Sequence, residues 1–326
     1  MNIKKIAAAI VTASLGLGLA SAAHAQAYPS KPITLVVPTG PGGGFDLVAR
    51  RLEKVLAKNL GQSVVVINRP GSGSLVGTMA VINSAPDGYT LMMGGLSNII
   101  FNGSMYKKRP YDPMADFTAI GVVAQTPYVM LARRDLTQGD ITSVTRFALA
   151  NPGKLNIGNA GAGTGQQVLG AAYVKETGVK LVSVPYQSAQ AVYTDLLGGR
   201  VDLLVDTLPS ARRFIESKQV NALFTTGTKR DPLFPNLPTA RESGLSGSEM
   251  TSWFGLFALS KTPPEVLAKL HKALELSLKD EELRTQLQAG GFQPAAYVPA
   301  ATTRKFVEAE YKKWTQVIQS AGITLD

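Results

Sequence analysis

The sequence predicts an α/β protein of two lobes, because short apolar runs, glycine-rich turns and amphipathic stretches follow one another in a repeated order. The apolar run 33–37 is followed by a turn at 40–44 and then by 45–58, whose apolar residues share one helical face. The same order recurs over residues 64–93 and again over 155–205. Such alternation is typical of a mostly parallel sheet flanked by helices, which we expect in each lobe.

The individual elements follow from these runs. In the first series we expect strands at 33–37, 64–67 and 89–93 and helices at 45–58 and 75–83. In the second series we expect strands at 155–158, 181–184 and 201–205 and helices at 166–177 and 189–197. Between the two series, residues 117–133 form an extended segment that we expect to separate the lobes.

The C-terminal part of the chain has a different pattern, with helices that have no strands between them. Pro263 and Pro264 open one helix, and a final helix begins at about Thr302. Terminal helices of this kind usually pack on a lobe built earlier, so we expect the first lobe to be discontinuous. The predicted organisation is lobe 1 at 26–124 and 250–326, lobe 2 at 125–249, and a ligand cleft between them.

The first residues have the layout of a cleavable secretory signal. Lys4 and Lys5 precede an apolar run at 6–20, and Ala23-His24-Ala25 stands before Gln26. We therefore expect residues 1–25 to be removed after Ala25 and the product to reach the periplasm. No other stretch approaches the 18 or more apolar residues of a membrane span, and without cysteine there is no acceptor for a lipid anchor.

The composition excludes several functional classes. The chain has no cysteine, which excludes disulfides and cysteine-ligated metals, and His271 is the only histidine after the leader. A multi-histidine metal site is therefore excluded, and a Ser-His-Asp triad would depend on that one residue. The 33 Lys and Arg residues outnumber the 23 Asp and Glu residues, and they are scattered along the chain. This pattern favours a solvated basic surface over a nucleic-acid footprint. We expect a monomer with no cofactor, no metal, no bound nucleic acid and no enzymatic activity.

Three glycine-rich turns offer main-chain donors to a ligand. They lie at Gly40 to Gly44, Gly71 to Ser74 and Gly161 to Gly165, each between a predicted strand and helix. The first N–H groups of a helix are unpaired and its dipole favours negative charge there, so turns facing one cleft would bind an anion without lysine. The alternative is that each turn is only a tight connection. Phe45 breaks a dinucleotide fingerprint and Gln166-Gln167 breaks a phosphate loop.

Two carboxylates stand near these turns, and each has two interpretations. Asp46 lies in the first turn of the helix 45–58, where it could cap the helix or orient the glycine turn. Asp206 follows the strand 201–205, at the edge of an open α/β sheet where ligands bind. Because an ionised Asp206 would repel an acid, it would contact a ligand amine or hydroxyl, or else fix a loop.

An ordered set of short motifs extends over nearly the whole mature chain. In the first half these motifs are Ile33-Thr34-Leu35-Val36-Val37-Pro38, Pro41-Gly42-Gly43 with Asp46, Arg69-Pro70-Gly71, Pro86-Asp87-Gly88-Tyr89-Thr90 and Tyr111-Asp112-Pro113. In the second half they are Asn151-Pro152-Gly153-Lys154-Leu155, Val184-Pro185-Tyr186, Asp195-Leu196-Leu197-Gly198-Gly199, Pro238-Thr239 with Glu242 and Gly244, and Trp253. In this set and order the chain resembles the extracytoplasmic receptors of tripartite tricarboxylate transporters, the Bug-type proteins.

The resemblance implies a two-lobed periplasmic binding protein fold, type II-like, that closes on a small carboxylate and presents it to a membrane permease. It also implies that backbone amides and ordered waters hold the acid group. Carried over by position, the binding residues of the first lobe are Pro38, Thr39, Gly42, Gly43, Gly44, Phe45, Asp46 and Ser97. Those of the second lobe are Ala162, Gly163, Thr164, Gln166, Gln167, Tyr186 and Asp206.

Three departures from the family pattern bear on specificity. Thr39 stands where the family usually has Phe, Gln166-Gln167 replaces a pair that commonly contains His, and Gln187 replaces a frequent Lys. Threonine enlarges that side of the pocket and adds a donor, while Phe45 supplies an aromatic wall. The implied ligand is a dicarboxylate, with an aromatic acid such as terephthalate as one candidate. The alternatives are an exported carboxylate-processing hydrolase or lyase, and a partner protein of a sensor kinase.

Overall fold

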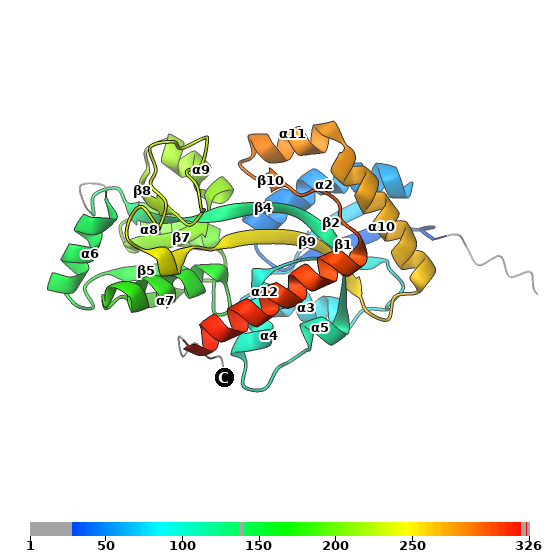
Figure 1. Ribbon diagram of the computed structural model, residues 1–326, viewed down its shortest axis with the longest axis horizontal. Helices are drawn as coiled ribbons and strands as arrows, with labels where there is room; N and C mark the ends of the chain where they lie inside the picture. Colours follow the sequence, from blue (N-terminus) through cyan, green and yellow to red (C-terminus); the bar gives the residue numbers. More distant parts are fainter. Residues whose placement is uncertain (1–27, 137–139, 321–323, 325–326) are drawn as a thin grey trace, which may run out of the picture.

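The computed structural model describes residues 28–136, 140–320 and 324 (Figure 1). The expected leader and its cleavage site after Ala25 lie outside these residues. In the described part of the chain, no helix is both long enough and apolar enough to cross a membrane.

The described residues form the predicted α/β fold, but their ten strands belong to one sheet that runs through both lobes, whereas a sheet was expected in each lobe. Its strand order is β2-β1-β3-β9-β4-β7-β5-β6, and β8 and β10 each pair with β4. The strand bounds are β1 Ile33–Val37, β2 Val64–Asn68, β3 Thr90–Gly95, β4 Phe117–Arg133, β5 Asn156–Asn159, β6 Val182–Pro185, β7 Leu203–Thr207, β8 Val220–Thr225, β9 Thr251–Leu259 and β10 Gln293–Pro294.

Parallel strands form the outer part of the sheet in each lobe, and antiparallel strands form its centre. In lobe 1, β2, β1 and β3 are parallel, and β9 and β4 follow them antiparallel. In lobe 2, β6, β5 and β7 are parallel, and β7 and β8 both pair antiparallel with β4. The expectation of mostly parallel sheets therefore holds for the outer strands of each lobe and fails at the crossing strands.

The long strand β4 passes from one lobe to the other, and it spans the whole segment predicted to be extended. Its first part pairs with β9 as far as Pro127↔Thr251, whereas from Tyr128 onward it pairs with β7. The chain thus crosses between lobes at Pro127–Tyr128 and again just before Thr251. We propose the lobe boundaries at these two neighbouring crossings.

Helices cover both faces of the sheet. The longer helices are α2 Gly44–Leu60, α3 Leu75–Ile82, α6 Ile141–Ala150, α7 Gly165–Thr177, α8 Ala189–Leu197, α9 Leu208–Glu216, α10 Pro264–Lys279, α11 Glu281–Ala289 and α12 Ala300–Ser320. Short turns of helix are η1 Leu96–Phe101, α4 Asn102–Met105, α5 Pro113–Asp116 and η2 Ser246–Ser248. The C-terminal helices pack on lobe 1: α10 and α11 lie against α2, and α12 lies against η1, α4 and β4.

The amphipathic pattern of α2 shows why these helices form where they do. Val48, Leu52 and Leu56 are fully buried against the sheet and α10. The helix ends at Gly61, whose φ of 71° lets its N–H donate to the carbonyl of Ala57. This packing fixes the start of α2, and with it the loop that carries the predicted binding residues.

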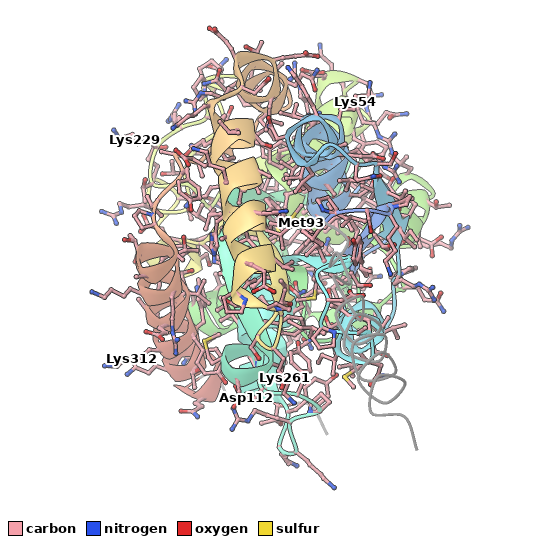
Figure 2. All side chains as sticks on the ribbon, turned by 90° about the vertical axis from the view of Figure 1, so that its right-hand side faces the viewer. Lys54, Met93, Asp112, Lys229, Lys261 and Lys312 are labelled. Atoms are coloured by element: carbon pink, nitrogen blue, oxygen red, sulfur yellow. The ribbon has the colours of Figure 1, made fainter. Side chains whose placement is uncertain are left out.

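Basic side chains are spread over the surface, in agreement with the sequence. Lys54, Lys229 and Lys312 project outward from separate parts of the molecule, whereas Met93 lies inside it and is fully buried (Figure 2). These three labelled lysines therefore lie on different parts of the surface.

Candidate functional site

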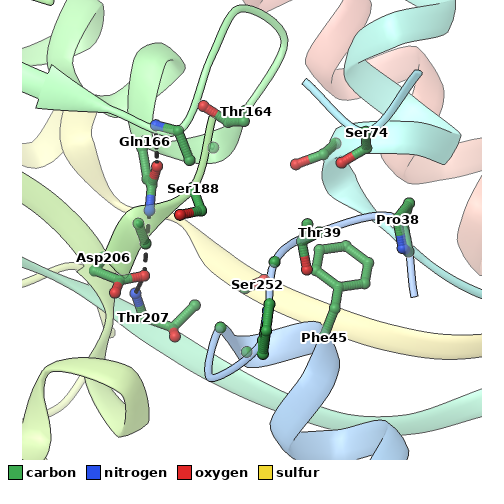
Figure 3. Close-up of a pocket in the computed structure, with 18 of the residues that line it drawn as sticks. Pro38, Thr39, Phe45, Ser74, Thr164, Gln166, Ser188, Asp206, Thr207 and Ser252 are labelled. Atoms are coloured by element: carbon green, nitrogen blue, oxygen red, sulfur yellow. Dashed lines mark hydrogen bonds between the residues drawn. The ribbon is translucent and has the colours of Figure 1, made fainter. Parts of the chain in front are cut away.

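A pocket lies between the lobes, and both lobes and the crossing strands line it (Figure 3). Lobe 1 contributes Pro38, Thr39, Gly40, Pro41, Gly43, Gly44, Phe45, Gly71, Ser74 and Ser97. Lobe 2 contributes Ala160, Thr164, Gly165, Gln166, Gln187, Ser188, Ala189, Asp206 and Thr207. The remaining lining residues, Tyr128, Ser252 and Phe254, belong to β4 and β9.

Five helices begin at this pocket. The residues that cap the N-termini of α2, α3, α7, α8 and α9 all line it: Gly43, Ser74, Thr164, Ser188 and Thr207. The first N–H groups of a helix have no partner within the helix, and the helix dipole adds positive potential there. The helix N-termini therefore add positive potential at both walls, and no cationic side chain occurs among the described lining residues.

The polar side chains of the lining leave hydrogen-bonding capacity free. Among the described lining residues there is no Lys or Arg, and Asp206 is the one acidic residue. Three buried side-chain atoms of the lining have no hydrogen-bond partner: Thr39 Oγ1, Ser74 Oγ and Asp206 Oδ2. Because a buried polar atom without a partner is costly, these atoms favour a polar ligand that satisfies them.

Asp46 holds the first-lobe loop and does not line the pocket. Its Oδ2 accepts a hydrogen bond from the N–H of Gly42 at 2.9 Å and another from Arg50 Nε at 3.1 Å. Its Oδ1 accepts from Asn68 Nδ2 at 2.9 Å. Of the two roles weighed for Asp46, the geometry supports the orienting one: the carboxylate ties the loop to α2 and β2.

Gln166 and Asp206 form a hydrogen-bonded wall in lobe 2 (Figure 3). Gln166 Oε1 accepts from the N–H of Ala160 at 2.6 Å, and its Nε2 donates to Asp206 Oδ1 at 3.3 Å. The same Oδ1 accepts from the N–H of Thr207 at 2.8 Å. Burial raises the pKa of Asp206 to about 6, although these hydrogen bonds oppose the rise.

Nine of the predicted binding residues line the pocket, and six do not. Those that line it are Pro38, Thr39, Gly43, Gly44, Phe45, Ser97, Thr164, Gln166 and Asp206. Those outside the lining are Gly42, Asp46, Ala162, Gly163, Gln167 and Tyr186.

Two of the residues outside the lining hold loops that contribute to it. Gln167 Oε1 accepts from the N–H of Gly163 at 2.8 Å, within the 161–165 turn. The Tyr186 hydroxyl turns away from the pocket and donates to Asp195 at 2.7 Å. Gln167 and Tyr186 therefore maintain the geometry of their loops, as Asp46 does for the first-lobe loop.

The sequence predictions missed part of the lining. Ser188 carries a usable signal, since a serine directly before the predicted helix 189–197 is a typical N-cap. Tyr128, Ser252 and Phe254 carry none, because they lie on crossing strands far apart in the chain and meet only in the folded protein. The described residues also contain no group of three or more His, Cys, Asp and Glu that could hold a metal ion.

Three solved structures resemble this chain over nearly its whole length. The periplasmic binding protein BugD is 32% identical with a TM-score of 0.86, and the match covers 91% of this chain and 99% of that one. An R. palustris protein solved with adipate is 31% identical with a TM-score of 0.86, covering 91% and 99%. MatC from Rhodopseudomonas palustris, solved with bound malate, is 30% identical with a TM-score of 0.85, covering 89% and 100%.

The two-lobed α/β fold and the pocket between its lobes place the protein in the class of periplasmic binding proteins. The family model of the tripartite tricarboxylate transporter family receptor, TctC, matches residues 48–323. The chain therefore belongs to this receptor family, whose members bind solutes and are not enzymes. The resemblance drawn from the motifs is confirmed.

Proposed function

We propose that this protein is the periplasmic receptor of a tripartite tricarboxylate-type transporter, and that it binds a small dicarboxylate between its lobes. In this proposal the leader is cleaved after Ala25 and the mature protein delivers its ligand to a membrane permease. The protein acts by binding and closure alone, so no catalytic residue is required.

The observation that carries this proposal is the convergence of five helix N-termini on a pocket without lysine or arginine. Hydrogen bonds from N–H groups to an ionised acceptor are about twice as strong as those between neutral groups. Since the caps come from both lobes, an acid with two anionic ends could contact α2 or α3 at one end and α7 or α8 at the other. The geometry thus favours a dicarboxylate over a neutral sugar or a cation.

The apolar part of the lining narrows the ligand class further. Phe45 and Phe254 meet edge to face, with ring centroids 5.1 Å apart and planes at 87°, and both border the pocket. Such a wall suits the carbon chain of an aliphatic diacid or the ring of an aromatic one such as terephthalate. Malate and adipate, the ligands of two structural neighbours, are both dicarboxylates.

Isothermal titration of the mature protein with malate, adipate, terephthalate, citrate, glutamate and glucose tests the ligand class. We expect saturable binding of at least one dicarboxylate and none of glucose. Binding of glucose alone, or no heat with any carboxylate from a folded sample, contradicts the proposal.

A pair of variants at Gly43 tests the use of main-chain donors. Gly43→Pro deletes one N–H, whereas Gly43→Ala keeps it, and an added Cβ meets nothing closer than 3.6 Å there. The φ of −79° at Gly43 suits proline as well as alanine. We expect the proline variant to bind about 10- to 100-fold more weakly than the alanine variant, because it loses one hydrogen bond to a charged group. Equal affinities in two folded variants would show that this N–H does not contact the ligand.

A further inference from the structure

We propose that Asp206 is a specificity-determining residue that carries a proton whenever the pocket holds a carboxylate, so that the receptor takes up the anion together with one proton from solvent. This inference rests on the proposed function. Asp206 was considered above as a contact for a ligand amine or as a residue that fixes a loop. Here its role is that of a neutral, protonated acid beside a bound anion.

The position of the Asp206 carboxyl is the first ground for this proposal. The residue is 3% exposed and lies at the end of β7, on the lobe 2 wall of the pocket. Oδ1 is occupied by the donors of Gln166 and Thr207, whereas Oδ2 is buried with no hydrogen-bond partner. An ionised carboxylate with one bare oxygen in such a site is unfavourable, and a proton on Oδ2 removes the charge.

The groups around Asp206 supply no compensating cation. Tyr193 faces it from α8 and Tyr128 from β4, and burial raises the pKa of both tyrosines, so they stay neutral. The Tyr193 hydroxyl has no partner of normal hydrogen-bond geometry, but it lies close enough to Asp206 to act as a further neutral donor that lowers the pKa of Asp206, and burial outweighs this effect. Gln166 on α7 and Thr207 at the start of α9 contribute only neutral donors. The guanidinium of Arg213 on α9 stacks on Phe214 and donates to Gln190, so it is engaged outside the pocket.

A bound carboxylate makes the charge imbalance worse. The ligand and Asp206 would share one enclosed pocket and compete for the same N–H groups, and no lysine or arginine lines it. When two carboxylates occupy a common site, one pKa rises strongly. Burial already raises the pKa of Asp206 to about 6, so a ligand anion pushes it higher. The protonated Oδ2 then becomes a donor, which favours an acceptor such as a carboxylate oxygen and disfavours an ammonium group.

The proposal fixes the pH dependence of binding. Above the pKa of free Asp206, each binding event takes up one proton, so affinity falls about tenfold for each unit of pH. Asp206→Asn is neutral at every pH and nearly the same shape, so its affinity is expected to be independent of pH. An amino-acid ligand whose ammonium contacts an ionised Asp206 would show the opposite trend.

The test is isothermal titration of the mature protein with malate and with adipate between about pH 7 and about pH 8.5, where both acids are ionised. Two buffers that differ in ionisation enthalpy give the number of protons taken up. The expected result is uptake of about one proton by the wild type and of none by Asp206→Asn. If the variant does not fold, the number of protons that the wild type takes up on binding is sufficient to test the proposal.

Two negative results have separate meanings. Tight carboxylate binding with constant affinity and no proton uptake overturns the role of Asp206 and leaves the proposed function standing. Absence of carboxylate binding at every pH, in wild type and variant alike, contradicts the proposed function itself. Binding that strengthens with rising pH also overturns this inference, because it requires an ionised Asp206.

Discussion

Gly40 of lobe 1 and Ser188 of lobe 2 meet across the pocket so closely that a Cβ on Gly40 would lie 2.9 Å from Ser188 Cβ. A second contact of this kind joins Gly73 to Ala162, whose carbonyl oxygen would lie 1.5 Å from a Cβ on Gly73. The structure is thus a closed form in which a glycine of lobe 1 touches a residue of lobe 2 at each of these two contacts. A side chain at either glycine would therefore oppose closure.

Gly40→Ala therefore weakens ligand binding by opposing closure. The φ of Gly40 lies outside the left-handed region, so alanine adds bulk without backbone strain. We expect affinity to fall about tenfold or more, the effect of 1.4 kcal/mol against the closed state, with little change in the stability of the unliganded protein. Titration calorimetry and thermal unfolding of the same sample measure both quantities.

Removal of the Ser188 side chain provides the control for this steric effect. In the Ser188→Gly background the Cβ contact is gone, and glycine replaces a serine cap at a cost of only a few tenths of a kcal/mol. Gly40→Ala should then change affinity much less than it does beside serine. An equal loss in both backgrounds would show that the substitution acts on the loop and not on the contact between lobes.

Gln166→Ala destabilises the protein. The substitution leaves the half-buried Ala160 N–H without its acceptor and removes a donor from Asp206, so we expect a loss of about 1–3 kcal/mol in the free energy of unfolding. Gln187→Ala is the matched control, since Gln187 also lines the pocket but is exposed. Urea denaturation that finds the two variants equally stable would refute the bridging role of Gln166.

Asp206 makes folding stability fall with rising pH. Its pKa is about 6 in the folded protein against 3.8 in the unfolded chain, so between these values the folded state binds more protons. The contribution is present in full below about pH 4 and is lost as pH rises to about 6, which amounts to about 2–3 kcal/mol. Asp206→Asn lacks this contribution. Denaturant unfolding at several pH values measures the free energy of unfolding of both proteins. The value for the variant minus that for the wild type should grow from about pH 4 to about pH 7.

Glu310 joins two tryptophans beside the crossing strands. Its Oε2 accepts from Trp253 Nε1 at 3.3 Å and from Trp314 Nε1 at 3.1 Å, and so links β9 to α12. Both rings are buried, so Glu310→Ala leaves two indole N–H groups unpaired and should lower the free energy of unfolding by about 2 kcal/mol. Glu310→Gln keeps an acceptor and should cost less. Thermal unfolding that gives both variants the same loss would contradict this linkage.

The regular elements were predictable because their signals are local. The helix predicted at 189–197 has those bounds in α8, and the segment 117–133 forms β4 over its full predicted length. Apolar spacing and glycine turns within a few residues decide such elements. The antiparallel pairing of β4 with β9 could not be predicted from such local signals, because it joins residues more than a hundred positions apart.

The site was predictable where main-chain geometry determines it. Gly43 and Thr164 stand at strand-to-helix turns, and both line the pocket. Tyr186 was assigned by position in the family, but its hydroxyl is engaged by Asp195. Tyr128 and Ser252 come together from two crossing strands, at 3.4 Å between their hydroxyl oxygens, and no pattern near either residue indicates it.

The most direct test of how this receptor holds its ligand is a crystal structure of the mature protein with a bound dicarboxylate. We expect the carboxylate oxygens to lie about 2.7–3.1 Å from first-turn nitrogens of helices in both lobes, such as those of Gly44 and Gly165. A ligand whose acid groups sit outside this pocket, or are held chiefly by lysine or arginine side chains, would contradict the account.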